Sequence, residues 1–121
     1  MHLTDQQRQL FEKMNESCSI SDWQKYFKRV LEIRGFEGEG VMRKMLLLTE
    51  EVGELAKAIR KEEKLMKVDY DRIDNYDTVK SEIADVFIVL ISICNECEIN
   101  ICEALQEKER INVQREWGSS K

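Results

Sequence analysis

No proline interrupts this chain, and three of its five glycines stand together in the segment RGFEGEG, residues 34–40. Because proline and glycine supply most tight turns, a 121-residue chain with so few of them favours helix throughout. Hydrophobic residues make up 42% of the chain and charged residues 36%, which suits one apolar core with a charged surface. The sequence therefore predicts a single all-α domain over residues 1–121, a bundle of four to five helices, with 34–40 as its clearest loop.

The net charge limits the kinds of partner that the protein is expected to bind. Lys and Arg total 19 against 24 Asp and Glu, a net charge of −5, so the average surface repels a nucleic-acid duplex. The N-terminus has no basic region followed by an apolar stretch, and the longest apolar run, VFIVLISIC, is far shorter than a membrane span. We therefore expect a cytoplasmic protein that binds neither nucleic acid nor membrane.

Capping patterns and apolar spacing give the helices. The polar residues that favour helix N-termini occur at four places: Thr4 with Gln7, Ser21 with Gln24, Asp77 or Thr78, and Asn100 with Glu103. The helices that they open are expected to end near residue 15, before the loop, near residue 98 and near residue 116, and a further long helix is expected over 41–63. Residues 1–20 form an N-terminal helical extension in this prediction, 64–77 an irregular or weakly helical connector, and 118–121 a flexible tail.

The four cysteines include one C-x-x-C pair, Cys94 and Cys97. A zinc site needs about four such ligands, but the chain has no second C-x-x-C, and His2 is its only histidine. Free cysteine packs as a small hydrophobic residue, so we interpret these residues as ordinary buried or half-buried thiols.

The two longest predicted helices carry acids beside their apolar rows. In the helix over 41–63, the apolar row is Met45, Leu48, Val52, Leu55 and Ile59, and the adjacent row is Leu47, Glu51, Glu54 and Ala58. In the next helix, the apolar row contains Ile83, Val86, Leu90 and Ile93, and the adjacent row is Glu82, Asp85, Val89 and Ser92. If the apolar rows pack together, four carboxylates meet at the edge of that interface.

Such a meeting of carboxylates is costly, because like charges repel and each group loses hydration. A hard divalent cation that binds oxygen ligands offsets the repulsion between the carboxylates, and Mg²⁺ is the natural candidate. Gly53 lies between Glu51 and Glu54 and costs the helix about 1 kcal/mol relative to alanine, which is easier to understand if something approaches the backbone there. Acidic pairs at this spacing are also common on solvated helix faces, so the residues alone leave both interpretations open.

At these positions the chain resembles the all-α nucleoside triphosphate pyrophosphohydrolases, specifically the MazG-like members. The resemblance rests on EEVGE at 50–54, EIAD at 82–85 with the apolar run after it, and KERINVQR at 108–115, and it spans about residues 23–117. The turn before the last helix often contains glycine in such sequences, whereas here it reads CEIN. The connector between the two acidic motifs is also long.

The resemblance implies hydrolysis of a nucleoside triphosphate between its α- and β-phosphates, giving a monophosphate and pyrophosphate. It implies a site built between the two central helices and completed by a homodimer or a tetramer of two dimers. The implied Mg²⁺ ligands, with Mn²⁺ as the alternative ion, are Glu51, Glu54, Glu82 and Asp85.

The resemblance also assigns roles around the metal. Glu50 matches a position that is not always acidic in the family, so it is a candidate for orienting water or a metal ligand, and a plain surface charge explains it equally well. The implied contacts to phosphates and sugar are Lys108, Asn112 and Arg115, for which ordinary charge pairs on a solvated helix are the alternative. Trp23 is a candidate for stacking on the base, and a core position is its alternative.

Three functional hypotheses follow. The first is a house-cleaning enzyme that acts on ribo- or deoxynucleoside triphosphates. The second keeps the chemistry and changes the substrate, as in dUTP or phosphoribosyl-ATP pyrophosphohydrolases. The third is a non-catalytic helical dimerisation module in which the acids hold a structural ion or keep the surface soluble.

Overall fold

The computed structural model describes residues 2–14, 18–36, 38–63 and 78–118. These residues form five helices and no strand, which confirms the all-α fold class. The helices are α1 (Leu3–Met14), α2 (Ile20–Ile33), α3 (Val41–Glu63), α4 (Val79–Glu96) and α5 (Ile101–Asn112). The predicted connector, 64–77, and most of the predicted tail lie outside the described residues.

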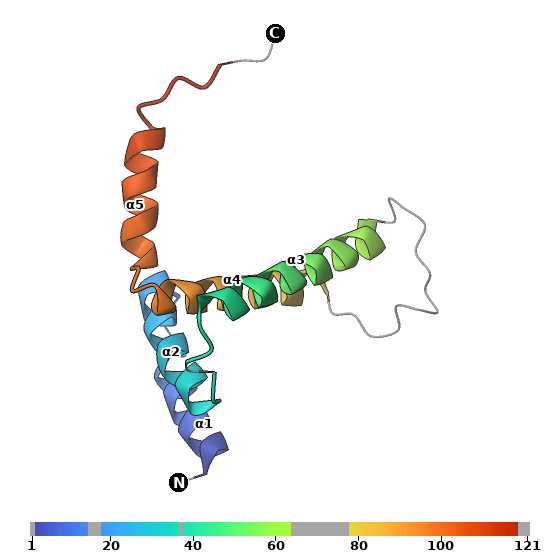
Figure 1. Ribbon diagram of the computed structural model, residues 1–121, viewed down its shortest axis with the longest axis vertical. Helices are drawn as coiled ribbons and strands as arrows, with labels where there is room; N and C mark the ends of the chain where they lie inside the picture. The colour runs from blue at the N-terminus through green and yellow to red at the C-terminus, as the bar shows by residue number, and fades with distance from the viewer. Residues whose placement is uncertain (1, 15–17, 37, 64–77, 119–121) are drawn as a thin grey trace.

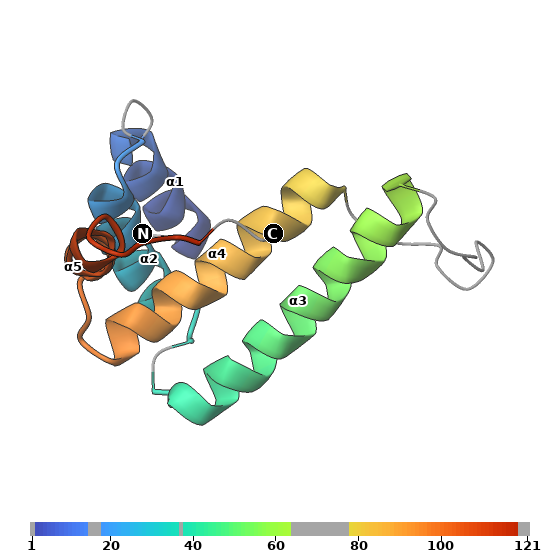
Figure 2. The ribbon, with the colours of Figure 1, turned by 90° about the horizontal axis from the view of Figure 1, so that it is seen from above.

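The helices form two parts that share α4. The first two helices pair with each other, and α2 also packs against α4 and α5. On its other side α4 packs along the length of α3, so that the two make a long hairpin that projects from the rest of the molecule (Figures 1 and 2). Figure 1 also shows α5 leaving the base of this hairpin at a steep angle.

The apolar core lies where α2 crosses the C-terminal half of α4 and the start of α5. It contains Tyr26, Phe27, Val30, Ile91 and Ile101, of which Val30 is completely buried. The Phe27 and Tyr26 rings meet edge to face with their centroids 5.1 Å apart, a favoured aromatic geometry. This core fixes the root of the hairpin.

The turn between α4 and α5 is tied to α2 by one side chain. The Gln24 amide nitrogen donates to the Ile99 carbonyl over 2.7 Å, and the Gln24 amide oxygen accepts from the Ile101 backbone over 3.0 Å. In the same turn Glu98 takes a left-handed φ of 56°. A non-glycine residue pays about 1 to 2 kcal/mol for that conformation, so the sequence departure noted in CEIN has a backbone cost.

Two of the predicted caps are confirmed and two are wrong. Thr78 accepts from the Ser81 backbone over 3.2 Å at the start of α4, and Asn100 accepts from Glu103 over 3.0 Å at the start of α5. The cap of α2 is Ser19 instead of Ser21, and α1 begins before Thr4. The last helix ends at Asn112, about four residues earlier than predicted.

The loop over 34–40 is confirmed. Gly35, Gly38 and Gly40 all have φ between 81° and 86°, a region that other residues rarely adopt. These glycines allow the backbone to turn between α2 and the long α3.

The predicted packing of the apolar rows is wrong for the single chain. Met45, Val52 and Ile59 are 51%, 48% and 41% exposed, whereas Ala58, in the acidic row, is completely buried. The same holds on α4, where Glu82 and Ser92 are buried and Ile83 is 42% exposed. The rows that carry the acids therefore face each other, and much of the apolar surface of the hairpin points outward.

Two further observations bear on the sequence predictions. Among the described residues no helix is both long and apolar enough to cross a membrane, and the cytoplasmic location stays a prediction. All four cysteines are free thiols, of which Cys94 and Cys102 are half-buried as expected, whereas the expected burial is wrong for Cys18 and Cys97. Cys94 packs against the core, whereas Cys97 is exposed.

Candidate metal centre

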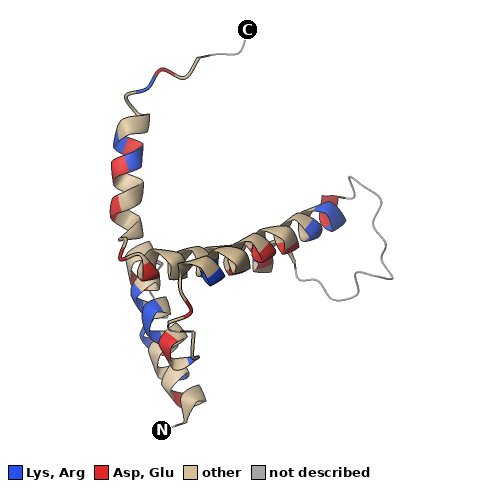
Figure 3. Cartoon of the chain, in the orientation of Figure 1, with Lys and Arg blue, Asp and Glu red and all other residues tan. Residues whose placement is uncertain are grey.

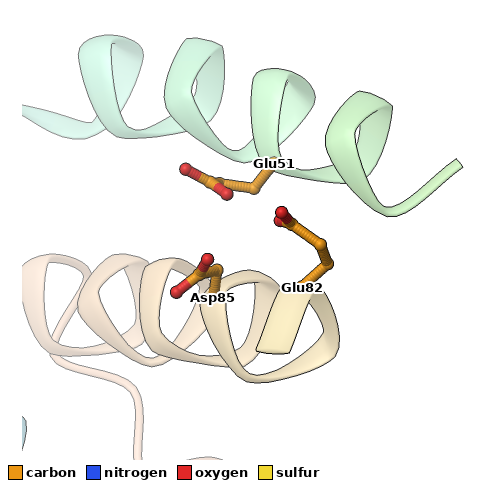
Figure 4. Close-up of side chains that lie close together, drawn as sticks. All are labelled: Glu51, Glu82 and Asp85. Atoms are coloured by element: carbon orange, nitrogen blue, oxygen red, sulfur yellow. The ribbon is translucent and has the colours of Figure 1, made fainter. Parts of the chain in front are cut away.

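Three carboxylates meet in the seam between α3 and α4. Glu51 comes from α3, while Glu82 and Asp85 come from α4, three residues apart and so on one face of that helix (Figure 4). One oxygen from each lies within 4.8 Å of the others. Glu82 is only 4% exposed, and the other two are half-buried. The pairing of two helices, and no loop, positions all three.

The geometry and chemistry of this cluster suit a hard divalent cation. Oxygens on opposite sides of an octahedral Mg²⁺ ion lie about 4.2 Å apart, so the three carboxylates need little movement to share one ion. Without a cation, three acids at this distance in a partly buried seam repel each other. The site's carboxylate oxygens are also ligands that Mg²⁺ and Mn²⁺ prefer.

The other two predicted acids lie beside the cluster. Glu54 follows one turn after Glu51 on α3, and one of its carboxylate oxygens lies 3.6 Å from the Lys57 ammonium. The Glu54 side chain is 45% exposed. Glu50 is exposed on the same helix. Neither belongs to the group of three oxygens, so the roles predicted for Glu54 and Glu50 stay predictions.

The predicted phosphate-binding residues lie far from the acids within one chain. Lys108 and Asn112 are on α5, which packs against α2 and leads away from the middle of the hairpin (Figure 1). The Asn112 amide contacts Glu109 over 3.4 Å, and the Arg115 guanidinium lies 5.2 Å from the centre of the Trp117 ring. The fold of one chain therefore brings none of these three to the acid cluster.

Trp23 takes the core position that was its alternative role. Its ring stacks on Phe27 with centroids 5.6 Å apart and meets Tyr26 edge to face. It also lines an apolar hollow of about 400 Å³ together with Phe87. Stacking of Trp23 on a base stays a prediction.

Sequence reasoning missed one buried polar pair in the same seam. The Lys44 ammonium donates to the Ser92 hydroxyl over 2.7 Å and lies 3.5 Å from a Glu96 carboxylate oxygen. Lys44 stands two helical turns before Glu51, so its helical spacing from that acid was the signal that could have placed it on the inner face.

Charge along the hairpin is unevenly distributed. Figure 3 shows acids over its middle, whereas the last turn of α3 carries Arg60 and Lys61. These two basic residues are followed by Glu62 and Glu63, so the end of α3 carries charges of both signs, whereas the acid cluster lies in an acidic stretch.

The model of the MazG nucleotide pyrophosphohydrolase domain matches residues 40–117, more than half of the chain. The chain belongs to the MazG family. The match contains all five predicted acids and the three predicted phosphate-binding residues, whereas Trp23 lies before it. Searches of curated proteins and of solved structures found no match.

Membership gives the acid cluster a chemical context. At the level of the family, MazG domains imply pyrophosphohydrolase activity on nucleotides, and they typically depend on a divalent metal. Within residues 2–14, 18–36, 38–63 and 78–118, the three converging carboxylates are the group whose geometry suits such an ion.

Proposed function

We propose that this MazG domain hydrolyses ribo- or deoxynucleoside triphosphates to the monophosphate and pyrophosphate, with Mg²⁺ or Mn²⁺ bound by Glu51, Glu82 and Asp85. The observation that carries the proposal is the convergence of these carboxylates within 4.8 Å in the seam of a chain that belongs to the family. The biological role that follows is removal of unwanted nucleotides from the cellular pool.

The ion, its carboxylate ligands and the attacking water have separate roles in the proposed hydrolysis. When bound, the divalent ion supplies positive charge that offsets the charge developing on the phosphate oxygens during displacement. The three carboxylates fix the ion between the helices, and burial of Glu82 keeps this ligand rigid. Water is the nucleophile, the bond between the α- and β-phosphates breaks, and pyrophosphate leaves. Glu54 or Glu50, at the border of the site, orients that water.

A homodimer, alone or paired into a tetramer, completes the site in this proposal. The support is the apolar surface left outside by the hairpin: Met45, Val52 and Ile59 on α3, and Ile83, Phe87 and Leu90 on α4, each 37% to 51% exposed. Large apolar patches of this kind mark interaction surfaces in soluble proteins. With the hairpins of two copies packed together, α5 of one protomer carries Lys108, Asn112 and Arg115 to the phosphates at the acids of its partner.

The activity is tested by incubating the purified protein with Mg²⁺ or Mn²⁺ and each canonical ribo- and deoxynucleoside triphosphate, including dUTP, and with phosphoribosyl-ATP. Products are separated by chromatography. We expect monophosphate and pyrophosphate, and we expect Glu51→Gln to lower kcat/KM about 100-fold or more, because an amide is a poorer ligand for a hard ion. Glu107→Gln, the same change at an exposed position of α5, is the matched control. Diphosphate with orthophosphate as products, or activity that survives Glu51→Gln, contradicts the proposal.

The dimer is tested by light scattering after size-exclusion chromatography. Val52→Asp places a charge in the exposed apolar row of α3, so we expect the dimer to dissociate and activity per chain to fall. Leu3→Asp is the control, because Leu3 is similarly exposed, at 56%, but lies on α1. A monomeric wild type with full activity rules the dimer out.

A further inference from the structure

A buried ammonium group stands apart from the metal centre in the same seam. Lys44 is only 7% exposed, and its partner Ser92 is equally buried. The third member of the group, Glu96, has a side chain that is 30% exposed and so lies toward the solvent. Lysine is almost never fully buried unless it is paired, and an aliphatic side chain would fill the same space between two helices at lower cost. Packing alone does not account for a lysine here.

Lys44 and Ser92 line a hollow that reaches the metal centre. Asp85, one of the three clustered carboxylates, lines the same hollow of about 250 Å³. Its walls are largely apolar and include Leu47 and Val89. A smaller hollow of about 150 Å³ is also lined by Lys44 and Ser92. A concave apolar space with a few well-placed polar groups is the usual form of a small-molecule site.

The distance along the helices indicates which part of a nucleotide reaches Lys44. Lys44 stands seven residues before Glu51 on α3, and Ser92 stands seven residues after Asp85 on α4, so each is about 10 Å from its acid along the helix axis. Because α3 and α4 run in opposite directions, both displacements point the same way. Phosphates held at the acids lie too far from Lys44 for contact, whereas the sugar and base extend over that distance.

The hydrogen-bonding capacity of the pair indicates the kind of base. Lysine has three N–H donors, and in the described part of the chain two of them are directed to Ser92 and Glu96. The Ser92 hydroxyl accepts from Lys44, so its own hydrogen is left to be donated. Both buried groups therefore offer donors to a ligand. A carbonyl oxygen at position 4 of a pyrimidine or position 6 of a purine satisfies such donors, whereas an exocyclic amino group at the same position leaves them unpaired.

We propose that Lys44 determines base specificity by donating a hydrogen bond to the 4-carbonyl oxygen of a pyrimidine or the 6-carbonyl oxygen of a purine, so that the hollow prefers uracil, thymine and guanine to cytosine and adenine. The proposal rests on the proposed function, because it places the base of the same triphosphate whose phosphates lie at the acids. Ser92 positions the Lys44 ammonium and adds the second donor.

The test compares substrates that differ at the carbonyl or amino position of the same ring: dUTP with dCTP, and dGTP with dATP. We expect wild-type kcat/KM to favour the carbonyl member of each pair about tenfold or more, since hydrogen bonds to charged groups are strong. Lys44→Met keeps the length of the side chain and should bring both ratios near one, mainly through KM. Lys13→Met, on α1, is the matched control and should leave the ratios unchanged.

Two further measurements test the role of Lys44 even if Lys44→Met folds poorly. Ser92→Ala removes one donor with a smaller change in packing and should lower both ratios about threefold even if Lys44→Met folds poorly. Isothermal titration calorimetry with dUMP and dCMP measures the base preference without catalysis. Lys44→Met should remove the difference in affinity between the two.

The possible failures are distinguishable. If the wild type hydrolyses the triphosphates and Lys44→Met leaves the ratios unchanged, or lowers kcat for all four substrates alike, Lys44 does not read the base. A wild-type preference for dCTP and dATP also overturns the proposal and points to an acceptor such as Glu39, which lines the larger hollow. If the wild type hydrolyses none of the triphosphates, the proposed function itself fails.

Discussion

The two faces of α4 differ in the side chains that they bury. Toward α2 it contributes Ile91 to a core of aromatic and aliphatic residues, whereas toward α3 it buries the polar Glu82 and Ser92 together with Val89. Burial of apolar surface stabilises the fold, but burial of charge costs free energy unless a partner or an ion offsets it. In this MazG domain, α4 therefore separates the apolar core on one face from the candidate metal site on the other.

This separation predicts that each face can be disturbed without the other. A substitution in the core should change the free energy of unfolding and leave the response to metal intact. A substitution among the acids should remove the response to metal and leave the free energy of unfolding without metal nearly unchanged. The coupling between the two faces is α4 itself, which is continuous from the Thr78 cap to the turn before α5.

The largest expected effect belongs to the core. Phe27 is 8% exposed and contacts both Tyr26 and Trp23, so Phe27→Ala should lower the free energy of unfolding by about 3 to 5 kcal/mol. Urea denaturation followed by circular dichroism measures the change. Phe11→Ala is the control, because Phe11 is 48% exposed, and we expect it to cost about 1 kcal/mol or less. Equal losses of unfolding free energy in the two variants would mean that Phe27 does not lie in the core.

The next effect belongs to the acidic face. Adding Mg²⁺ or Mn²⁺ at 100 times its dissociation constant should raise the free energy of unfolding by about 2.7 kcal/mol, since the ion binds the folded state. Asp85→Asn should remove most of this gain, because the amide replaces one of the three clustered carboxylates. Thermal unfolding with and without metal, after treatment with a chelator, measures it.

The two regions are compared directly when the same titration is carried out on the core variant. Phe27→Ala should start from a lower stability and still gain the full increment from the metal. If Phe27→Ala loses the gain in stability on adding metal, or if Asp85→Asn keeps it, the two faces of α4 are not independent.

Much of the fold follows from local sequence signals. The bounds of α3, the glycine loop before it, and the caps at Thr78 and Asn100 depend on residues that are adjacent in the chain. The cap of α2 could not be chosen from sequence. Ser19 and Ser21 are each followed three residues later by a polar residue, and only the structure shows that Ser19 accepts the backbone hydrogen bond.

The candidate site was predictable as a set of residues but not as a packing arrangement. Helical spacing places Glu82 and Asp85 on one face, yet it does not say whether α3 covers that face or the apolar face beside it. The expectation that the most apolar rows pack within one chain failed at Val52 and Ile83, which remain exposed. Spacing also cannot give the direction of α5, which depends on the turn at Glu98.

The smallest expected effect uses the thiols near the end of α4. Burial, with a smaller contribution from neighbouring Cys97, raises the pKa of Cys94 above its ordinary value of 9.0. Because the thiolate is the reactive form, iodoacetamide at pH 8 should alkylate exposed Cys97 at least about threefold faster than Cys94, as measured by peptide mass spectrometry.

The same shift gives a sign for the pH dependence of stability. A raised pKa means that the folded state holds the Cys94 proton more tightly than the unfolded state, so this contribution is fully present below about pH 9 and is lost as the pH rises through the folded pKa. In guanidinium the two thiols should react at similar rates, because burial is gone. If Cys94 reacts as fast as Cys97 in the folded protein, the core does not cover Cys94, and the stabilising face of α4 ends before that residue.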